Sequence, residues 1–175
     1  KLNNVVSFLG TGKTNANFDK QIKDWKNDFD KNFFVNVNIV SNFYKILSKT
    51  SKGSAILLTS ALAGSSRVKA PIGYSVAKSS LITYVNHVAP YLAEYGVRII
   101  SVSPGNVFYK GGRWEEIIKK NKNIINDYIK KEVPLKRLAN IEEIAWIYFC
   151  LLNKNNTFMT GNNIILDGGQ SNSIL

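Results

Sequence analysis

Tyr74 and Lys78 are the two side chains of this sequence whose types and spacing best suit proton chemistry. They lie four residues apart in the segment YSVAK, and that spacing places two side chains on one face of a helix. A lysine ammonium beside a phenol favours the phenolate and lowers the tyrosine pKa from its usual value of about 10. Such a tyrosine can give a proton to a carbonyl oxygen or take one from an alcohol.

A serine precedes this pair at a position that suits the same chemistry. Ser60 ends the apolar segment GSAILLTS, fourteen residues before Tyr74. Its hydroxyl could therefore hydrogen-bond the oxygen that Tyr74 protonates. A Tyr–Lys pair alone is most often an exposed surface pair. The pair is a far more specific indication of proton chemistry when it is combined with a strand-end serine and a later strand that ends in SPGNV.

The segment SFLGTGKT suggests a second function, which is phosphate binding. Gly12, Lys13 and Thr14 match the last three positions of a P-loop, a motif that also needs a glycine five residues earlier. Residue 7 is a serine, so the loop lacks the glycine that lets backbone amides wrap around a phosphate. A nucleotidase that uses Lys13 is therefore a disfavoured alternative.

Apolar segments and the helices between them must position these side chains. The solid apolar runs predict strands, and runs with a period of three to four residues predict helices. The predicted strands are 3–9, 53–60, 97–105 and 162–169, and the predicted helices are 22–48, 72–95, 113–131 and 140–153. The alternation predicts an α/β fold with a parallel sheet covered on both faces. Ligands of such sheets bind beyond the carboxyl ends of the strands.

Length and composition suit one globular domain of 175 residues, with 45% apolar and 20% charged residues. The net charge of +11 comes from lysines spread along the chain, which does not predict a nucleic-acid surface. No apolar run is long enough to cross a membrane, and no signal peptide is found. The single cysteine, Cys150, excludes a disulfide framework and is expected in the core. We expect a cytoplasmic protein without a metal site.

At this point the sequence resembles the short-chain dehydrogenase/reductase family. The segments LLTSALAG, YSVAKSSL, YGVRIISVSPGNV, VPLKRLANIEEIA and MTGNNIILDGG follow the family's order at close to its spacing. The resemblance implies a Rossmann-type doubly wound parallel sheet with NAD or NADP as cofactor. It also implies hydride transfer between a carbonyl and a secondary alcohol. The alternative is a non-catalytic nucleotide-binding or regulatory protein on the same fold.

The resemblance also implies roles for individual residues. Tyr74 would be the proton donor and acceptor, and Lys78 would lower its pKa and hold the nicotinamide ribose. Ser60 would orient the substrate oxygen. When the chain is aligned to the family by the glycine that follows this strand, however, Ala61 occupies the position of the family's serine. The other residues expected beside the cofactor are Gly10, Pro104, Gly105, Asn106 and Val107.

The family's fourth catalytic residue is an asparagine that holds a water of the proton relay. Asn36 fits the spacing from Phe29, and Asn38 fits the spacing to Phe43. The two asparagines lie about 200° apart around a helix, so only one of them can face the site. We favour Asn36.

The family's glycine-rich phosphate turn has no counterpart in this sequence. Aligned to the family, Lys1 falls just before the fourth strand, and Ser7-Phe8-Leu9-Gly10 replaces the usual Asn-Asn-Ala-Gly. We therefore expect residues 1–175 to be a partial single domain, from the fourth strand to the C-terminus. Strand 3–9 would then be an exposed apolar edge, and the chain alone would bind a dinucleotide poorly.

The resemblance further implies a small-molecule carbonyl or alcohol substrate and a homodimer or homotetramer. Helices 22–48 and 74–95 correspond to the usual subunit contact of the family. The segment after Gly105 corresponds to its mobile lid, in which Tyr109 and Trp114 are candidate substrate contacts. No residue of the sequence selects one substrate.

Overall fold

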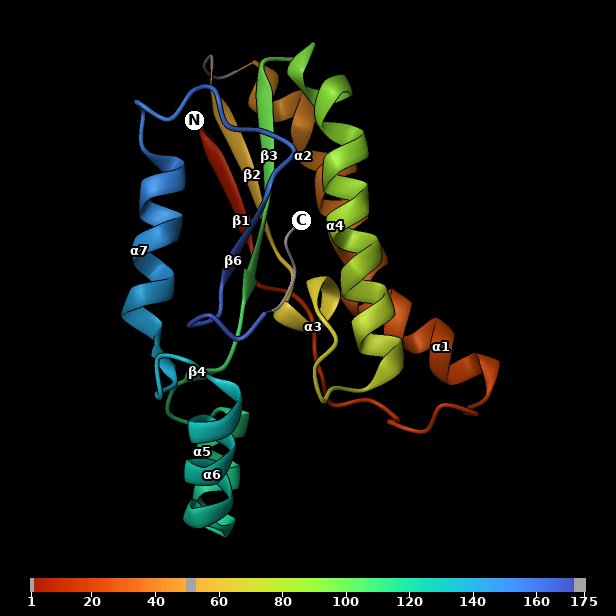
Figure 1. Cartoon of the computed structure of the whole chain (residues 1–175). Coiled ribbons are helices and arrows are strands. Elements are labelled where there is room, and N and C mark those ends of the chain that lie inside the picture. The colour runs from red at the N-terminus through yellow and green to blue at the C-terminus, as the bar shows by residue number, and fades with distance from the viewer. Residues whose placement is uncertain (1, 50–52, 172–175) are drawn as a thin grey trace.

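The computed structural model describes residues 2–49 and 53–171. Its centre is a parallel sheet of four strands in the order β1-β2-β3-β6 (Figure 1). The strands are β1 (Asn4–Ser7), β2 (Ser54–Thr59), β3 (Val97–Pro104) and β6 (Asn163–Leu166). Each lies within a segment predicted as a strand, so the α/β class and the parallel sheet are confirmed.

Helices cover both faces of this sheet (Figure 1). On one face, α2 (Val35–Ser48) and α4 (Ile72–Ala93) pack against the central strands. On the other face lies α7 (Ile141–Leu152). The strands β2 and β3 are buried almost throughout, because each contributes side chains to an apolar cluster on either side of the sheet. This rigid centre fixes the place where the strand ends meet.

The predicted helix 22–48 is interrupted. It consists of α1 (Ile22–Phe29), a π-helical turn η1 (Asp30–Phe34) and α2. A π-turn inserts a residue into the helical ladder and re-aims the side chains beside it. Here it accompanies the buried Asn32, which is hydrogen-bonded to Thr11 in a different segment. The apolar pattern could not show this turn, because a tertiary contact accompanies it.

The predicted helix 113–131 is also divided, at Asn121. Its parts are α5 (Arg113–Lys120) and α6 (Lys122–Glu132). The Asn121 backbone is extended, and its side-chain oxygen accepts a hydrogen bond from the Asn123 N–H. Asparagine favours this local bond over a continuous helix. The two short helices extend away from the sheet beneath α7 (Figure 1).

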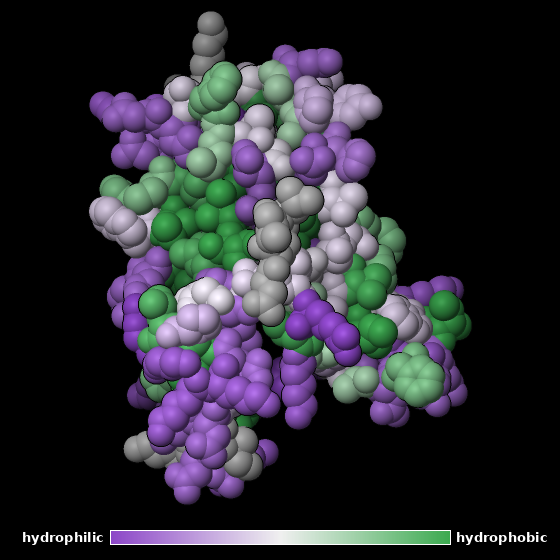
Figure 2. All heavy atoms as spheres, in the orientation of Figure 1, coloured by the Kyte–Doolittle hydropathy of each residue, from purple (hydrophilic) through white to green (hydrophobic). Residues whose placement is uncertain are grey.

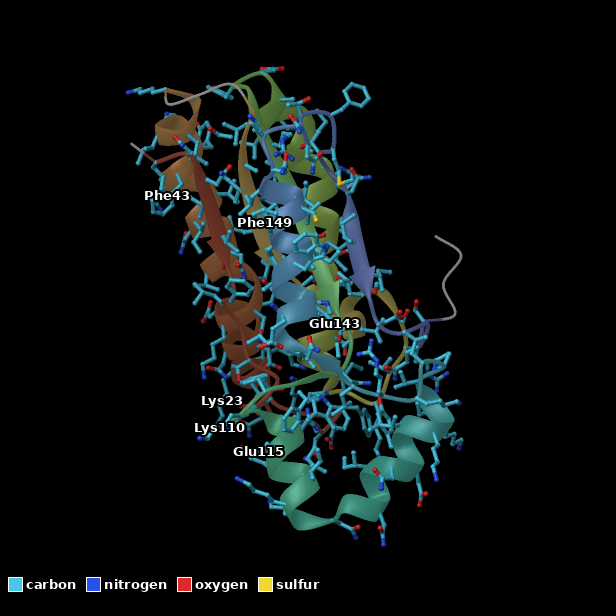
Figure 3. All side chains as sticks on the ribbon, turned by 90° about the vertical axis from the view of Figure 1, so that its left-hand side faces the viewer. Lys23, Phe43, Lys110, Glu115, Glu143 and Phe149 are labelled. Carbon is cyan, nitrogen blue, oxygen red and sulfur yellow. The ribbon has the colours of Figure 1, made fainter. Side chains whose placement is uncertain are left out.

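The helix α7 begins with a capping box. Asn140 accepts a hydrogen bond from the Glu143 N–H, and the Glu143 carboxylate accepts one from the Asn140 N–H. Arg137 forms two further bonds to the same carboxylate. Together they hold the pKa of Glu143 down at about 2, chiefly through Arg137. Figure 3 shows Glu143 at the beginning of the helix and Phe149 farther along it.

Shorter elements complete the fold. They are α3 (Leu62–Ser65) and the two-residue strands β4 (Val107–Phe108) and β5 (Ala139–Asn140), which pair in parallel. The expectation that Cys150 lies in the core is wrong, because its side chain is exposed on α7. Among the described residues, no helix has both the length and the apolar character needed to cross a membrane.

The outer edge of β1 has no partner strand among the described residues. Directly after this strand, Phe8 is 64% exposed and Leu9 is 47% exposed. Trp146 and Phe149 of α7 are also exposed, and their rings stack at 5.4 Å. At the opposite edge of the sheet, the space-filling view shows hydrophobic side chains in the region between α7 and β6 (Figure 2). In the described structure β1 is therefore an unpaired edge strand that is followed by exposed apolar side chains, while its own side chains are partly or fully buried.

Candidate active site

A cavity of about 350 Å³ lies where the carboxyl end of β3 meets α3, α4 and α5. Its walls include Ala61, Tyr74, Pro104, Gly105 and Trp114. These residues come from four separate parts of the chain, and the parallel sheet brings them together because its strands end at one edge. The expected place of the chemistry, beyond the strand ends, is therefore the place of this cavity.

Tyr74 lies in the first turn of α4 and lines the cavity. Burial of the phenol raises the pKa of Tyr74 to about 12, and the positive charge of Arg113 opposes part of this rise. The phenol is therefore protonated at neutral pH. In this structure the cation that lowers the pKa of Tyr74 is Arg113, and not Lys78 as we expected from the sequence.

Lys78 lies one helical turn after Tyr74 and is buried. Its ammonium donates hydrogen bonds to the main-chain oxygen of Thr59 at 2.7 Å and to that of Leu9 at 3.3 Å. It thus joins α4 to the ends of β1 and β2. Burial lowers the pKa of Lys78 to about 8, so the amine titrates close to neutral pH.

Gly10 provides the space beside this ammonium. A Cβ at Gly10 would lie 2.7 Å from Nζ of Lys78 and 2.8 Å from Oδ1 of Asn32. The backbone has φ +141° here, a conformation that side chains disfavour. A glycine is therefore required where the chain passes between the lysine and the asparagine.

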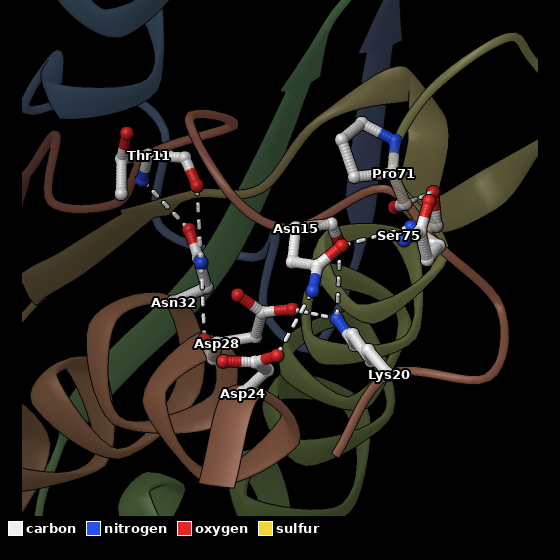
Figure 4. A network of polar contacts seen from close by, with 9 residues as sticks. Thr11, Asn15, Lys20, Asp24, Asp28, Asn32, Pro71 and Ser75 are labelled. Carbon is white, nitrogen blue, oxygen red and sulfur yellow. Dashed lines mark hydrogen bonds and ion pairs between the residues drawn. The ribbon is translucent and has the colours of Figure 1, made fainter. Parts of the chain in front are cut away.

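Asn32 is fully buried in η1, and the sequence pattern did not single it out. Its side-chain oxygen accepts a hydrogen bond from the Thr11 N–H at 2.8 Å, and its amide donates to the Thr11 and Asp28 carbonyls (Figure 4). It thereby fixes the loop after β1 close to Lys78. One available signal was its position four residues before Asn36, on the same helical face.

The structure separates the two asparagines that the sequence left open. Asn36 is buried, whereas Asn38 is exposed. The Asn36 side chain accepts a hydrogen bond from the Ser7 hydroxyl at 2.7 Å and donates to the Asn32 carbonyl at 3.1 Å. Asn36 therefore supports Asn32, and it is Asn32 that flanks Gly10 together with Lys78.

Ser60 lies outside the set of residues that line the cavity. It is buried, and its hydroxyl donates a hydrogen bond to the main-chain oxygen of Lys78 at 2.9 Å. Ala61 lines the cavity instead. The role of Ser60 in orienting a substrate therefore needs correction, since its hydroxyl anchors α4 and the next side chain toward the cavity is a methyl group.

The remaining predicted site residues are distributed as follows. Pro104, Gly105 and Asn106 line the cavity, as does Trp114, which stacks on Tyr128 with ring centroids 5.4 Å apart. In contrast, Val107 lies in β4, where it pairs with Ala139, and it does not line the cavity. Tyr109 is half exposed and does not line the cavity either.

Lys13, the candidate phosphate ligand of the P-loop alternative, is exposed. Its ammonium lies 3.6 Å from the Glu116 carboxylate, and both side chains are more than half exposed. The Thr14 N–H donates to the Gly12 carbonyl. The loop therefore forms a local turn at the surface, and this geometry gives no support to the P-loop alternative.

A buried ion pair lies directly behind the turn that carries Tyr74. Lys20 and Asp28 form this pair with side chains that are almost completely inaccessible, and Lys20 also lies 4.6 Å from the centre of the Trp25 ring. A Cβ at Gly73 would overlap both charged groups, at 2.1 Å from each. The first turn of α4 therefore rests on this pair (Figure 4).

The described residues fit one end of a dinucleotide. Tyr74 and Lys78 lie at the strand ends beside the close approach at Gly10 and the Pro104-Gly105 turn, which is a setting for a nicotinamide and its ribose. Among residues 2–49 and 53–171, no strand is followed by the full G-x-G-x-x-G pattern of a turn that holds a pyrophosphate. Across the same residues, no cluster of three or more His, Cys, Asp or Glu side chains could hold a metal ion.

Comparison with known protein families gives one match to nearly the whole chain. Residues 1–171 match the family described as enoyl-(acyl carrier protein) reductase. The chain is 28% identical over 149 residues to isoepoxydon dehydrogenase of Penicillium expansum, covering 85% of this chain and 57% of that protein. It is 30% identical over 171 residues to 3-oxoacyl-[acyl-carrier-protein] reductase of Buchnera aphidicola, covering 94% of this chain and 64% of that protein.

Solved structures show the same fold. The L-sorbose reductase of Gluconobacter frateurii, solved with NADPH and L-sorbose, superposes with a TM-score of 0.88 at 19% sequence identity. The superposition covers 98% of this chain and 67% of the reductase. The chain thus spans less than two thirds of the two curated relatives named above.

Proposed function

The chain belongs to the short-chain dehydrogenase/reductase family, and from this premise we propose that the whole protein is an NAD(P)-dependent oxidoreductase. It interconverts a carbonyl compound and a secondary alcohol. The observation that carries the proposal is the position of Tyr74, which lines a cavity at the strand ends one helical turn before the buried Lys78. The printed names of the relatives, which are dehydrogenases and reductases, support it.

Tyr74 is the acid and base of the proposed reaction. A bound nicotinamide supplies or accepts the hydride at the carbonyl carbon. In the reduction, the Tyr74 phenol donates its proton to the carbonyl oxygen, and in the oxidation the phenolate takes the proton back. Because burial raises the pKa of Tyr74 to about 12, the protonated form that reduction requires dominates at neutral pH.

Lys78 and Asn32 position the groups around this proton transfer. With a pKa of about 8, the Lys78 ammonium is mostly charged at neutral pH and is placed to hold the ribose of the nicotinamide. We assign the position of the relay asparagine to Asn32 in place of Asn36, because Asn32 approaches Gly10 beside Lys78. Asn36 then holds the Asn32 carbonyl in place. Pro104 and Gly105 would flank the nicotinamide ring.

The cellular setting and the assembly are part of the same proposal. We place the protein in the cytoplasm as a homodimer or homotetramer that contacts its copies through α2 and α4. A shallow depression on α4 beside η1, lined by Phe33, Val76, Tyr84 and His87 among others, suits a subunit contact. The expectation that residues 1–175 form only part of the family's domain stays a prediction.

The experiment that tests the function replaces Tyr74 by phenylalanine in the whole protein. We expect turnover of carbonyl substrates to fall by about three orders of magnitude or more, since general acid catalysis alone contributes roughly 10²–10⁴-fold. Binding of NADPH, measured by fluorescence titration, should be largely retained. Full activity of the Tyr74→Phe variant would refute the mechanism.

One observation favours a second candidate, a protein that binds a dinucleotide without turnover. The residue that faces the cavity after β2 is Ala61 and not a hydroxyl-bearing side chain. Wild-type protein that binds NADPH yet oxidises none of it with a broad carbonyl panel would favour this candidate. An Ala61→Ser variant that gained turnover would show that the missing hydroxyl is the reason.

A further inference from the structure

Among the residues that the structure describes, the cavity beside Tyr74 is lined by positive but not by negative side chains. Its charged wall residues are Lys69, in the loop between α3 and α4, and Arg113, the first residue of α5, and no Asp or Glu of that part of the chain lines it. A neighbouring cavity of about 300 Å³ differs, since Arg137 is accompanied there by Glu143 and Asp167. The excess of positive charge is therefore a property of the Tyr74 cavity.

Arg113 brings its charge close to the phenol. A Cβ at Gly12 would lie 3.9 Å from Nη1 of Arg113 and 4.0 Å from Cζ of Tyr74, so the guanidinium and the phenol flank one point. The two groups also interact electrostatically, because the positive charge of Arg113 lowers the pKa of Tyr74 and so opposes part of the rise caused by burial.

The guanidinium has no anionic partner within the part of the chain that the structure describes. The nearby acids of α5 are engaged elsewhere, because Glu115 pairs with Lys119 and Glu116 pairs with Lys13. No hydrogen bond or ion pair of the Arg113 side chain occurs among residues 2–49 and 53–171. An arginine presents a planar fork of N–H donors that matches a carboxylate in a bidentate arrangement.

The other walls of the cavity define the remainder of a ligand. Ala61 supplies no hydroxyl, and Arg113 brings its N–H donors beside Tyr74. The guanidinium is therefore the second donor for an oxygen-rich substrate. Ile117 and Ile125 line the cavity together with the stacked rings of Trp114 and Tyr128. The cavity therefore offers a cationic end near the reacting phenol and an apolar side.

We infer that the substrate is an oxo acid, whose carboxylate binds the Arg113 guanidinium while its carbonyl oxygen faces Tyr74. The same pairing serves the corresponding hydroxy acid in the oxidation. This inference rests on the proposed function, for which it names the substrate class. Lys69 adds a second positive charge to the wall of the cavity.

The test compares acids with their neutral esters. The whole protein is assayed with NADPH and acetoacetate, levulinate and phenylpyruvate, each against its methyl ester. We expect kcat/KM to favour the acids by roughly 10- to 100-fold, the range of a hydrogen bond to a charged group. The Arg113→Gln variant should lose this preference, and Arg113→Lys should keep part of it. Equal use of acid and ester by the wild-type protein would overturn the inference.

A matched control tests whether the preference for acids depends on the position of the positive charge in the cavity. Lys119 lies on the same helix, does not line the cavity and pairs with Glu115, so Lys119→Gln should retain the full preference for acids. If Arg113→Gln instead raises the KM for NADPH and leaves the acid-to-ester ratio unchanged, the guanidinium serves the cofactor and the inference is wrong. A preference for dihydroxyacetone phosphate over the acids would likewise overturn the carboxylate assignment.

Binding without turnover keeps the two proposals distinguishable. Phenyllactate and its methyl ester are titrated calorimetrically into the wild-type protein and the Arg113→Gln variant in the presence of NADP. Tighter binding of phenyllactate that depends on Arg113, in a protein that reduces no carbonyl, would support the inference while the proposed function fails. Equal binding of acid and ester would overturn the inference, whatever the activity.

Discussion

At the scale of single residues, the site depends on how burial changes two ionisable groups. Lys78 and Tyr74 lie one helical turn apart, yet burial moves their pKa values in opposite directions, down to about 8 and up to about 12. In both cases the uncharged form is favoured, as expected where water is excluded. The phenol thereby remains a proton donor, and the amine can lose its charge in mild alkali.

The pH dependence of stability should report the buried lysine. The pKa of Lys78 is about 8 in the folded protein against 10.5 when exposed, so between these values the unfolded chain binds more protons. The free energy of unfolding should therefore rise with pH from about 8 toward 10. Above pH 10, Tyr74 counteracts this, since its raised pKa makes stability fall as its phenol ionises in the unfolded chain.

Urea denaturation between pH 7 and 10 measures this effect. The rise in stability should be absent in Lys78→Met, which has no amine to titrate, and retained in Lys119→Met, which removes an exposed lysine. An identical pH slope in the wild-type protein and Lys78→Met would contradict the assignment of a lowered pKa to Lys78.

At the scale of elements, several segments meet at the buried pair of Lys20 and Asp28. Asp28 belongs to α1, Lys20 precedes that helix, and Gly73 of α4 packs against both. The Asp28 carbonyl also accepts a hydrogen bond from Asn32 of the π-turn (Figure 4). The pair therefore joins the helix that carries Tyr74 to the turn that carries Asn32.

Removing one partner of this pair should be costly. In Asp28→Ala, the ammonium of Lys20 remains buried without its counter-charge, and we expect a loss of about 3–5 kcal/mol of unfolding free energy. The double variant Lys20→Met/Asp28→Leu should be clearly more stable than Asp28→Ala, because it leaves no buried charge. Chemical denaturation of the variants gives these values, and a double variant that is less stable than Asp28→Ala would count against the pairing.

At the scale of the whole molecule, the two faces of the sheet are covered but its first strand is open. The outer edge of β1 is unpaired in the described structure, and Phe8 beyond it is 64% exposed, with its ring 4.8 Å from that of Tyr148. An unpaired edge next to an apolar surface favours association between copies. The chain of residues 1–175, prepared as such, should therefore self-associate.

Light scattering of that chain tests the expectation. Replacing Phe8 by serine should reduce the association, because it removes the largest exposed ring at the end of β1. Phe158 is completely exposed in the loop before β6, and Phe158→Ser is the matched control, with a smaller effect expected. If Phe158→Ser reduces the association more than Phe8→Ser does, the contact between copies does not lie at the end of β1.

Much of the fold and part of the site follow from local sequence patterns. Solid apolar runs mark the four main strands, and the spacing of four between Tyr74 and Lys78 places both at the start of α4. The capping box of Asn140 and Glu143 is equally local, since a helix start requires bonds within one turn. Such features are visible in the sequence because neighbouring residues determine them.

The remaining features depend on contacts between distant segments. Whether Ser60 or Ala61 faces the cavity is decided by the end of β2, where the Ser60 hydroxyl turns inward to the Lys78 carbonyl. The π-turn at Asn32 accompanies a bond to Thr11, 21 residues away. Arg113, at the start of α5, lies beside Tyr74 although the two residues are far apart in the sequence. The sequence by itself therefore determined the fold class and the placement of Tyr74 and Lys78 one turn apart on a single helix. The tertiary structure decided which residues surround Tyr74 and Lys78, because packing between distant segments selects them. These residues are Ala61 in place of Ser60, the buried Asn32, and Arg113.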